Sequence, residues 1–60
     1  MDLIFETGPM SPEKRALFVQ WFERTIGTEI DIDHDNNILC FELTRRELEK
    51  CREKLKEVLA

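Results

Sequence analysis

The stretch from Ala16 to Ile26 constrains the fold more than any other part of the chain, because it holds the single Trp and two of the four Phe residues. Placed on a helix, its apolar side chains cover an arc of about 200°, whereas one core contact needs about 100°. These side chains are Leu17, Phe18, Val19, Trp21, Phe22 and Ile26. Such a helix either lies between a sheet and a second helix, or leaves one flank for another chain.

The ends of this helix are marked by local signals. Ser11, Pro12 and Glu13 supply an N-cap, a proline at the first helical position and an acid in the positive first turn. Gly27 stands where a left-handed C-terminal cap is expected. The sequence therefore predicts a helix over residues 12–26.

Three segments have the composition of strands. Residues 2–6 form a short apolar run that ends in a turn-rich segment, and residues 28–33 alternate strictly between polar and apolar. Residues 38–43 are apolar on both faces until Glu42, so we expect this strand to be central. The polar residues 34–37 have turn chemistry and should join the second and third strands as a hairpin.

A capping box predicts the second helix. The Thr44 hydroxyl is expected to accept a backbone N–H, while the Glu47 side chain reaches back to the cap. From there an apolar stripe about 100° wide runs to the end of the chain, the width of a single core contact. The stripe consists of Leu48, Cys51, Leu55, Val58 and Leu59.

These elements predict a single small α+β domain over residues 1–60, a two-layer β-α-β-β-α arrangement. Its three-stranded, mainly antiparallel sheet should have strand order 1-3-2, with both helices on one face. The side chains expected to face the helices are Leu3, Phe5, Ile30, Ile32, Leu39, Phe41 and Leu43. Those expected on the opposite face are Asp2, Ile4, Glu6, Glu29, Asp31, Asp33, Ile38, Cys40 and Glu42.

Charge is distributed unevenly along the chain. The net charge is −4, but residues 1–43 carry nine acids and three bases, and residues 44–60 carry six bases and four acids. An acidic chain is not expected to bind nucleic acid directly. The predicted opposite face would collect six carboxylates around an apolar strip of Ile4, Ile38 and Cys40, which suits a positively charged partner.

The sequence thus predicts a non-enzymatic protein-binding module: a small acidic regulator, adaptor or inhibitor that docks on a basic site of a macromolecular partner. Such docking would block a nucleic-acid-binding surface if the partner's basic site serves that purpose. The expected partner-binding residues are Asp2, Ile4, Glu6, Glu29, Asp31, Asp33, Ile38 and Glu42. A homodimer is a further expectation, joined through the flank of the first helix that holds Leu17 and Trp21.

An alternative function comes from residues 31–42. Asp31, Asp33 and Asp35 stand at the first, third and fifth positions of this segment, and Glu42 stands at the twelfth. This spacing resembles the calcium loop of an EF-hand. The resemblance implies a calcium-binding protein, although Asn36 replaces the usual glycine and a hairpin is predicted where an EF-hand needs helices. The hairpin interpretation predicts no metal and no cofactor.

The remaining reactive side chains favour no enzyme. His34, the single histidine, lies in the predicted turn, where an exposed position is expected. Cys40 and Cys51 form no CxxC motif and are expected to be buried free thiols, with a disulfide between them as the alternative. The first ten residues lack a signal peptide's basic region, and no segment is long enough to cross a membrane, so we expect a cytoplasmic protein.

Overall fold

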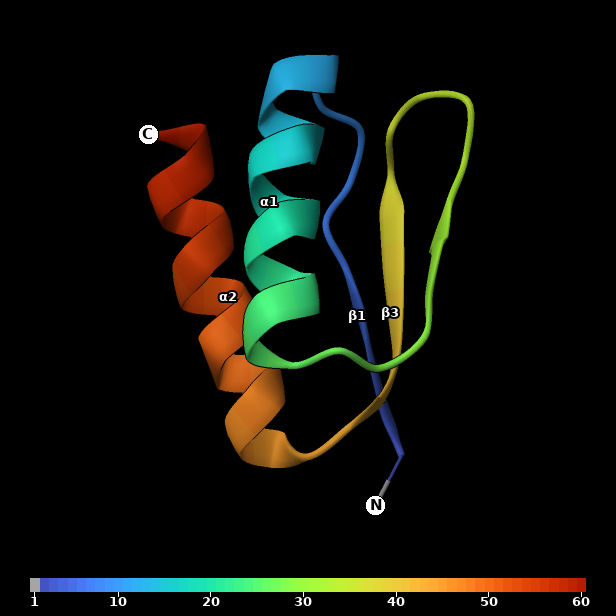
Figure 1. The fold of residues 1–60 in the computed structure, drawn as a ribbon, viewed down its shortest axis with the longest axis vertical. Helices are drawn as coiled ribbons and strands as arrows, with labels where there is room; N and C mark the ends of the chain where they lie inside the picture. The colour runs from blue at the N-terminus through green and yellow to red at the C-terminus, as the bar shows by residue number, and fades with distance from the viewer. Residues whose placement is uncertain (1) are drawn as a thin grey trace.

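The computed structural model describes residues 2–60 and contains five regular elements (Figure 1). In chain order these are β1 (Leu3–Glu6), α1 (Pro12–Thr25), β2 (Ile30–Ile32), β3 (Ile38–Leu43) and α2 (Arg45–Leu59). The β-α-β-β-α order predicted from the sequence is confirmed. The main difference in length is β2, which is shorter than the predicted strand over 28–33, because Thr28 and Glu29 precede the observed strand and Asp33 follows it.

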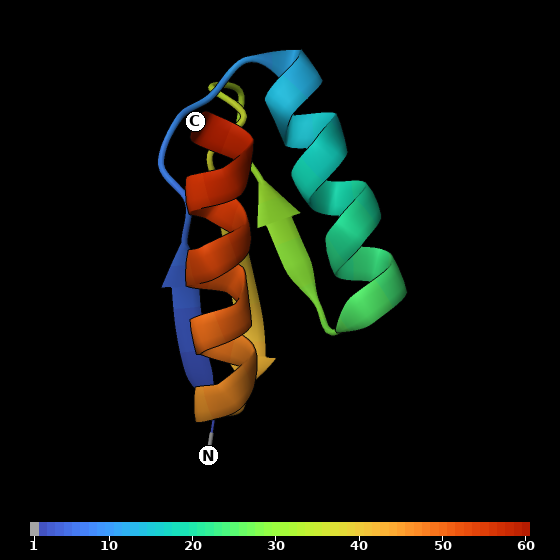
Figure 2. The same cartoon turned by 90° about the vertical axis from the view of Figure 1, so that its left-hand side faces the viewer.

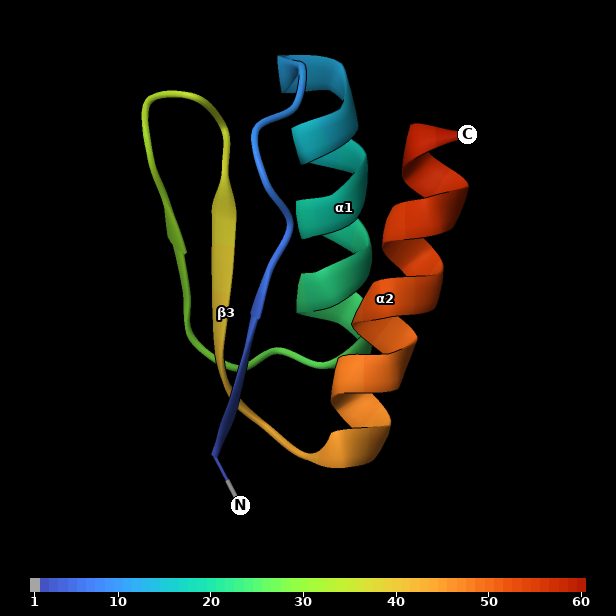
Figure 3. The same cartoon turned by 180° about the vertical axis from the view of Figure 1, so that it is seen from behind.

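The molecule has two layers, a sheet and a pair of helices. The sheet has the order β1-β3-β2, and both pairings are antiparallel, as predicted. Figure 2 looks onto the helical side, where α2 lies over β1 and β3 and α1 lies beside β2. In Figures 1 and 3 both helices lie on the same side of the strands. Among residues 2–60, no second layer therefore covers the other face of the sheet.

The helix ends follow the local signals in the sequence. The Ser11 hydroxyl accepts a hydrogen bond from the Lys14 amide at 3.3 Å, and Pro12 begins α1. Gly27 adopts a φ of 75° and donates its amide to the Phe22 carbonyl at 2.9 Å. At the start of α2 the Thr44 hydroxyl accepts the Glu47 amide at 3.2 Å, while Glu47 Oε1 accepts the Thr44 amide at 2.9 Å. The predicted capping box is thus present, and both helices begin where predicted.

The core lies between the helices and the sheet. Its fully buried members are Phe18, Phe22, Ile38, Cys40, Leu43 and Cys51. Phe18 is at the centre of the aromatic contacts: its ring centroid lies 5.5 Å from that of Trp21 and 6.4 Å from that of Phe5. Leu17, one residue before Phe18, is 56% exposed. One flank of the apolar arc of α1 is therefore buried in the core, whereas the flank at Leu17 is exposed.

The predicted facing of β3 is wrong over most of its length. Glu42 has a φ of 57° and forms a bulge, so that three residue steps on β3 (Cys40 to Leu43) match two steps on β1 (Phe5 to Leu3). The extra residue shifts the alternation of side chains by one position. Ile38 and Cys40, predicted to lie on the open face, are completely buried against the helices. Leu39 and Phe41, predicted to lie under the helices, are only half-buried and lie outside the core contacts.

Candidate functional site

The open face of the sheet carries three large apolar side chains that neither α1 nor α2 covers. Ile4 of β1 lies opposite the bulge of β3 that contains Phe41. The Phe41 amide donates to the Glu29 carbonyl at 2.9 Å, on the other edge of β3. Leu39 pairs with Glu6 of β1 and Asp31 of β2. Successive side chains of a strand point to opposite faces, so these residues share the face away from the helices. Ile4 is 58% exposed.

We define the outer sheet face as this apolar strip, Ile4, Leu39 and Phe41, together with the exposed acids around it. These acids are Asp2, Glu6, Glu29, Asp31, Asp33 and Glu42, all of them expected at a partner-binding surface from the sequence. Ile38 does not belong to this surface because it is buried in the core. The apolar centre of this face thus consists of Leu39 and Phe41 with Ile4, and not of the predicted Ile38 and Cys40. The sequence held no clear signal for which side chains of β3 face outward, because residues 38–41 are apolar at every position.

Asp33 holds the turn between β2 and β3. Its Oδ1 accepts the backbone amides of Asp35 at 2.9 Å and Asn37 at 3.1 Å. Hydrogen bonds from the Asn37 and Asp35 amides stabilise the carboxylate and hold the pKa of Asp33 below its ordinary value. The Asp33 carboxylate therefore faces its own backbone, and its first role is structural.

Asn37 links this turn to β1. Its side-chain Nδ2 donates to Glu6 Oε2 at 2.8 Å, and its Oδ1 accepts the Gly8 amide at 2.9 Å. The Glu6 carboxylate is thus also engaged within the fold. In contrast, no hydrogen bond or ion pair within residues 2–60 engages the side chains of Glu29 and Asp31. Glu29 and Asp31 are therefore among the acids of this face that are free to meet a partner.

Replacing Asp33 with Ala should lower the melting temperature at neutral pH, because two amides of the turn lose their acceptor. The folded-state pKa of Asp33 is depressed, so its contribution to stability is complete above the unfolded-state pKa of about 3.9 and is lost as the pH falls through the lower folded-state value. The difference in melting temperature between wild type and variant should therefore shrink below about pH 4. Thermal melts followed by circular dichroism over a pH series provide the measurement. An equal difference at every pH would refute the role of the ionised carboxylate.

The segment that resembles a calcium loop forms a strand, a turn and a second strand. Ligand atoms of Asp33, His34 and Asp35 lie within 4.8 Å of one another, all on exposed side chains. Glu42 lies elsewhere, because Asp31 pairs with Leu39 and the distance from Leu39 to Glu42 along β3 is about 10 Å. The structure therefore brings together three neighbouring residues of the turn but not the ring of Asp31, Asp33, Asp35 and Glu42 that an EF-hand requires.

The two cysteines are free and fully buried. A hydrogen bond with the Cys51 side chain and burial in an apolar core raise the pKa of the Cys40 thiol. A buried, protonated thiol is a weak nucleophile. His34 is 90% exposed in the hairpin turn, with Nε2 at 3.4 Å from Asp35 Oδ2. The histidine thus lies at the surface and the thiols lie in the interior. His34 and the cysteines therefore do not form a Cys–His pair that a substrate could reach.

Comparisons with family models, curated proteins and solved structures yield no match to this chain. Within residues 2–60, neither helix has the length and apolar character needed to cross a membrane.

Proposed function

We propose that this protein is a non-enzymatic protein-binding module, a small acidic regulator, adaptor or inhibitor that docks its outer sheet face on a basic surface of a macromolecular partner. The observation that carries the proposal is the uncovered strip of Ile4, Leu39 and Phe41 with carboxylates around it. An apolar centre surrounded by a polar rim is the usual anatomy of a protein-binding surface. A partner surface that binds nucleic acid would present the required positive charge.

The charges support a basic partner. Like charges on neighbouring strands destabilise a sheet. The side chains of β1, β2 and β3 include no Lys or Arg that would offset them. Glu29 and Asp31 have no intramolecular partner within residues 2–60, so their carboxylates are available for intermolecular ion pairs. The acidic field should also accelerate the encounter with a cationic surface.

The test uses affinity-tagged wild-type protein to capture partners, followed by binding measurements with each purified partner. Leu39→Asp places a charge in the apolar centre, and we expect it to abolish capture. The double variant Glu29→Gln with Asp31→Asn should weaken binding about tenfold, mainly through a slower association rate. Added salt should slow association of the wild-type protein in the same way.

The matched control is Glu13→Gln with Glu23→Gln, which removes the same number of charges from α1. Both of these acids are exposed and lie outside the sheet. The control should bind as the wild type does. If the α1 variants lose the partner while Leu39→Asp retains it, the outer sheet face is not the docking surface and the proposal fails.

A further inference from the structure

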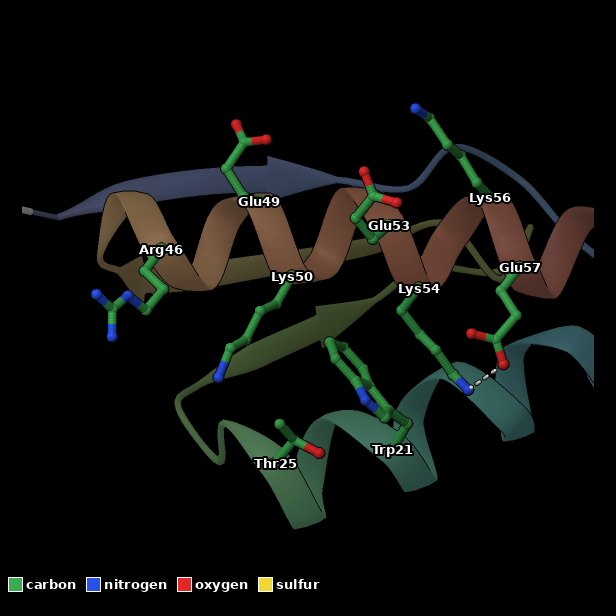
Figure 4. Close-up of a pocket in the computed structure, with 9 residues that line it drawn as sticks. All are labelled: Trp21, Thr25, Arg46, Glu49, Lys50, Glu53, Lys54, Lys56 and Glu57. Carbon is green, nitrogen blue, oxygen red and sulfur yellow. Dashed lines mark hydrogen bonds and ion pairs between the residues drawn. The ribbon is translucent and has the colours of Figure 1, made fainter.

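A groove of about 910 Å³ runs between α1 and α2, on the side of the molecule away from the outer sheet face (Figure 4). Trp21 and Thr25 of α1 line one wall. The wall formed by α2 has four bases and three acids: Arg46, Lys50, Lys54 and Lys56, with Glu49, Glu53 and Glu57. A second hollow of about 320 Å³ adjoins it, since both share Trp21, Lys54 and Glu57. The two hollows together extend along most of the seam between the helices.

The wall formed by α2 has a row of cations. Arg46, Lys50 and Lys54 are spaced four residues apart, and like charges at this spacing destabilise a helix. In Figure 4 Lys50 and Lys54 extend toward α1 on either side of Trp21, while Glu49 and Glu53 extend from the other side of α2. Lys54 pairs with Glu57 at 3.1 Å, whereas no ion pair within residues 2–60 involves Arg46 or Lys50. Arg46 and Lys50 are thus the two cations of the row that have no ion pair in the described part of the chain.

The α1 side of the groove is apolar. Trp21 is half-buried against Phe18 and Phe22, which leaves part of its indole facing the groove. Leu17 and Val58 continue this apolar surface into the second hollow. The groove therefore combines an apolar strip with a cationic edge, in a chain whose net charge is negative.

We infer that this groove binds an acidic amphipathic segment of another protein. Apolar side chains of the segment would pack on Trp21 and Leu17, while its carboxylates would pair with Arg46 and Lys50. An amphipathic segment binds a hydrophobic groove through its apolar face, and complementary charges at the edge add specificity. Binding at this groove does not depend on the outer sheet face, so the experiments can refute either proposal without refuting the other.

The charges favour this occupant over two others. Nucleic acid would bring a continuous row of phosphates past the three acids that also line the groove, and its backbone offers little to the apolar strip. A two-fold dimer through the groove, which is the assembly predicted from Leu17 and Trp21, would bring two copies of the cationic row into one interface. An acidic amphipathic segment can place its carboxylates beside Arg46 and Lys50, and its apolar face fills the apolar strip as well.

The test titrates the full chain with a synthetic amphipathic peptide that has Leu and Phe on one face and Glu and Asp on the other. Trp21 is the single Trp, so its fluorescence reports binding at the groove, and calorimetry provides an independent affinity. We expect saturable binding that weakens with salt. Lys50→Glu should reduce the affinity about tenfold or more, because a carboxylate then faces the peptide's acids.

The matched control is Arg45→Glu, which makes the same change in net charge at an exposed position of α2 outside the groove. Arg45→Glu and the sheet variant Leu39→Asp should both bind the peptide as the wild type does. Equal binding of a peptide with Lys and Arg in place of the acids, or an unchanged affinity in Lys50→Glu, would overturn the inference. Tighter binding of a single-stranded oligonucleotide, or sedimentation as a dimer that must dissociate before the peptide binds, would also overturn it.

Discussion

Replacing Phe18 with Ala is expected to leave much of the chain unfolded at room temperature. Phe18 is completely buried, and its ring contacts those of Phe5, Trp21 and Phe22. Truncation of a buried Phe to Ala costs about 3–5 kcal/mol, through lost transfer free energy and the cavity left behind. A domain of this size has a total stability of about 3–9 kcal/mol. The loss should therefore be comparable to the whole free energy of unfolding.

Urea denaturation followed by circular dichroism and Trp21 fluorescence measures this effect. The matched control is Leu17→Ala, because Leu17 is the preceding residue of α1 but is 56% exposed. Its loss should change the free energy of unfolding by about 0.5 kcal/mol or less. Comparable losses in the two variants would mean that α1 packs with a different face toward the sheet.

Two single variants that place an aspartate at successive positions of β3 should differ in whether the protein folds. Ile38→Asp puts a carboxylate into a completely buried position without a partner, and an unpaired buried charge costs several kcal/mol. We expect this variant to be unfolded near neutral pH. Leu39→Asp changes a half-buried residue on the outer sheet face, so the protein should remain folded.

Circular dichroism and one-dimensional NMR of the two variants provide the comparison. Each differs from wild type by one apolar residue exchanged for the same acid, so the comparison isolates the direction in which each side chain points. The bulge at Glu42 accounts for the expected difference, because it sets the alternation of β3. A folded Ile38→Asp together with an unfolded Leu39→Asp would show that β3 faces the other way. In that case the outer sheet face would need to be redefined.

Signals between near neighbours in the sequence were enough to place the elements. Ser11 and Pro12 begin α1, Gly27 follows its end, and the Thr44–Glu47 box begins α2. Each of these signals is a bond or a backbone preference confined to a few residues, so it can be read without knowledge of the fold. The strand order followed from polarity. β3 is apolar on both faces, which favours a central position, whereas the acids that alternate along β2 suit an edge strand.

Tertiary structure decided which face of β3 is buried. Residues 38–41 are apolar at every position, so their own pattern is compatible with either facing, and a bulge at Glu42 selects between them. The sequence likewise predicted that the Asp33 carboxylate would be available to a partner, but it accepts hydrogen bonds from two backbone amides of the turn. The groove beside Trp21 depends on how α2 lies against α1. Burial, register and grooves arise from contacts between residues far apart in the chain, and for that reason local patterns do not determine them.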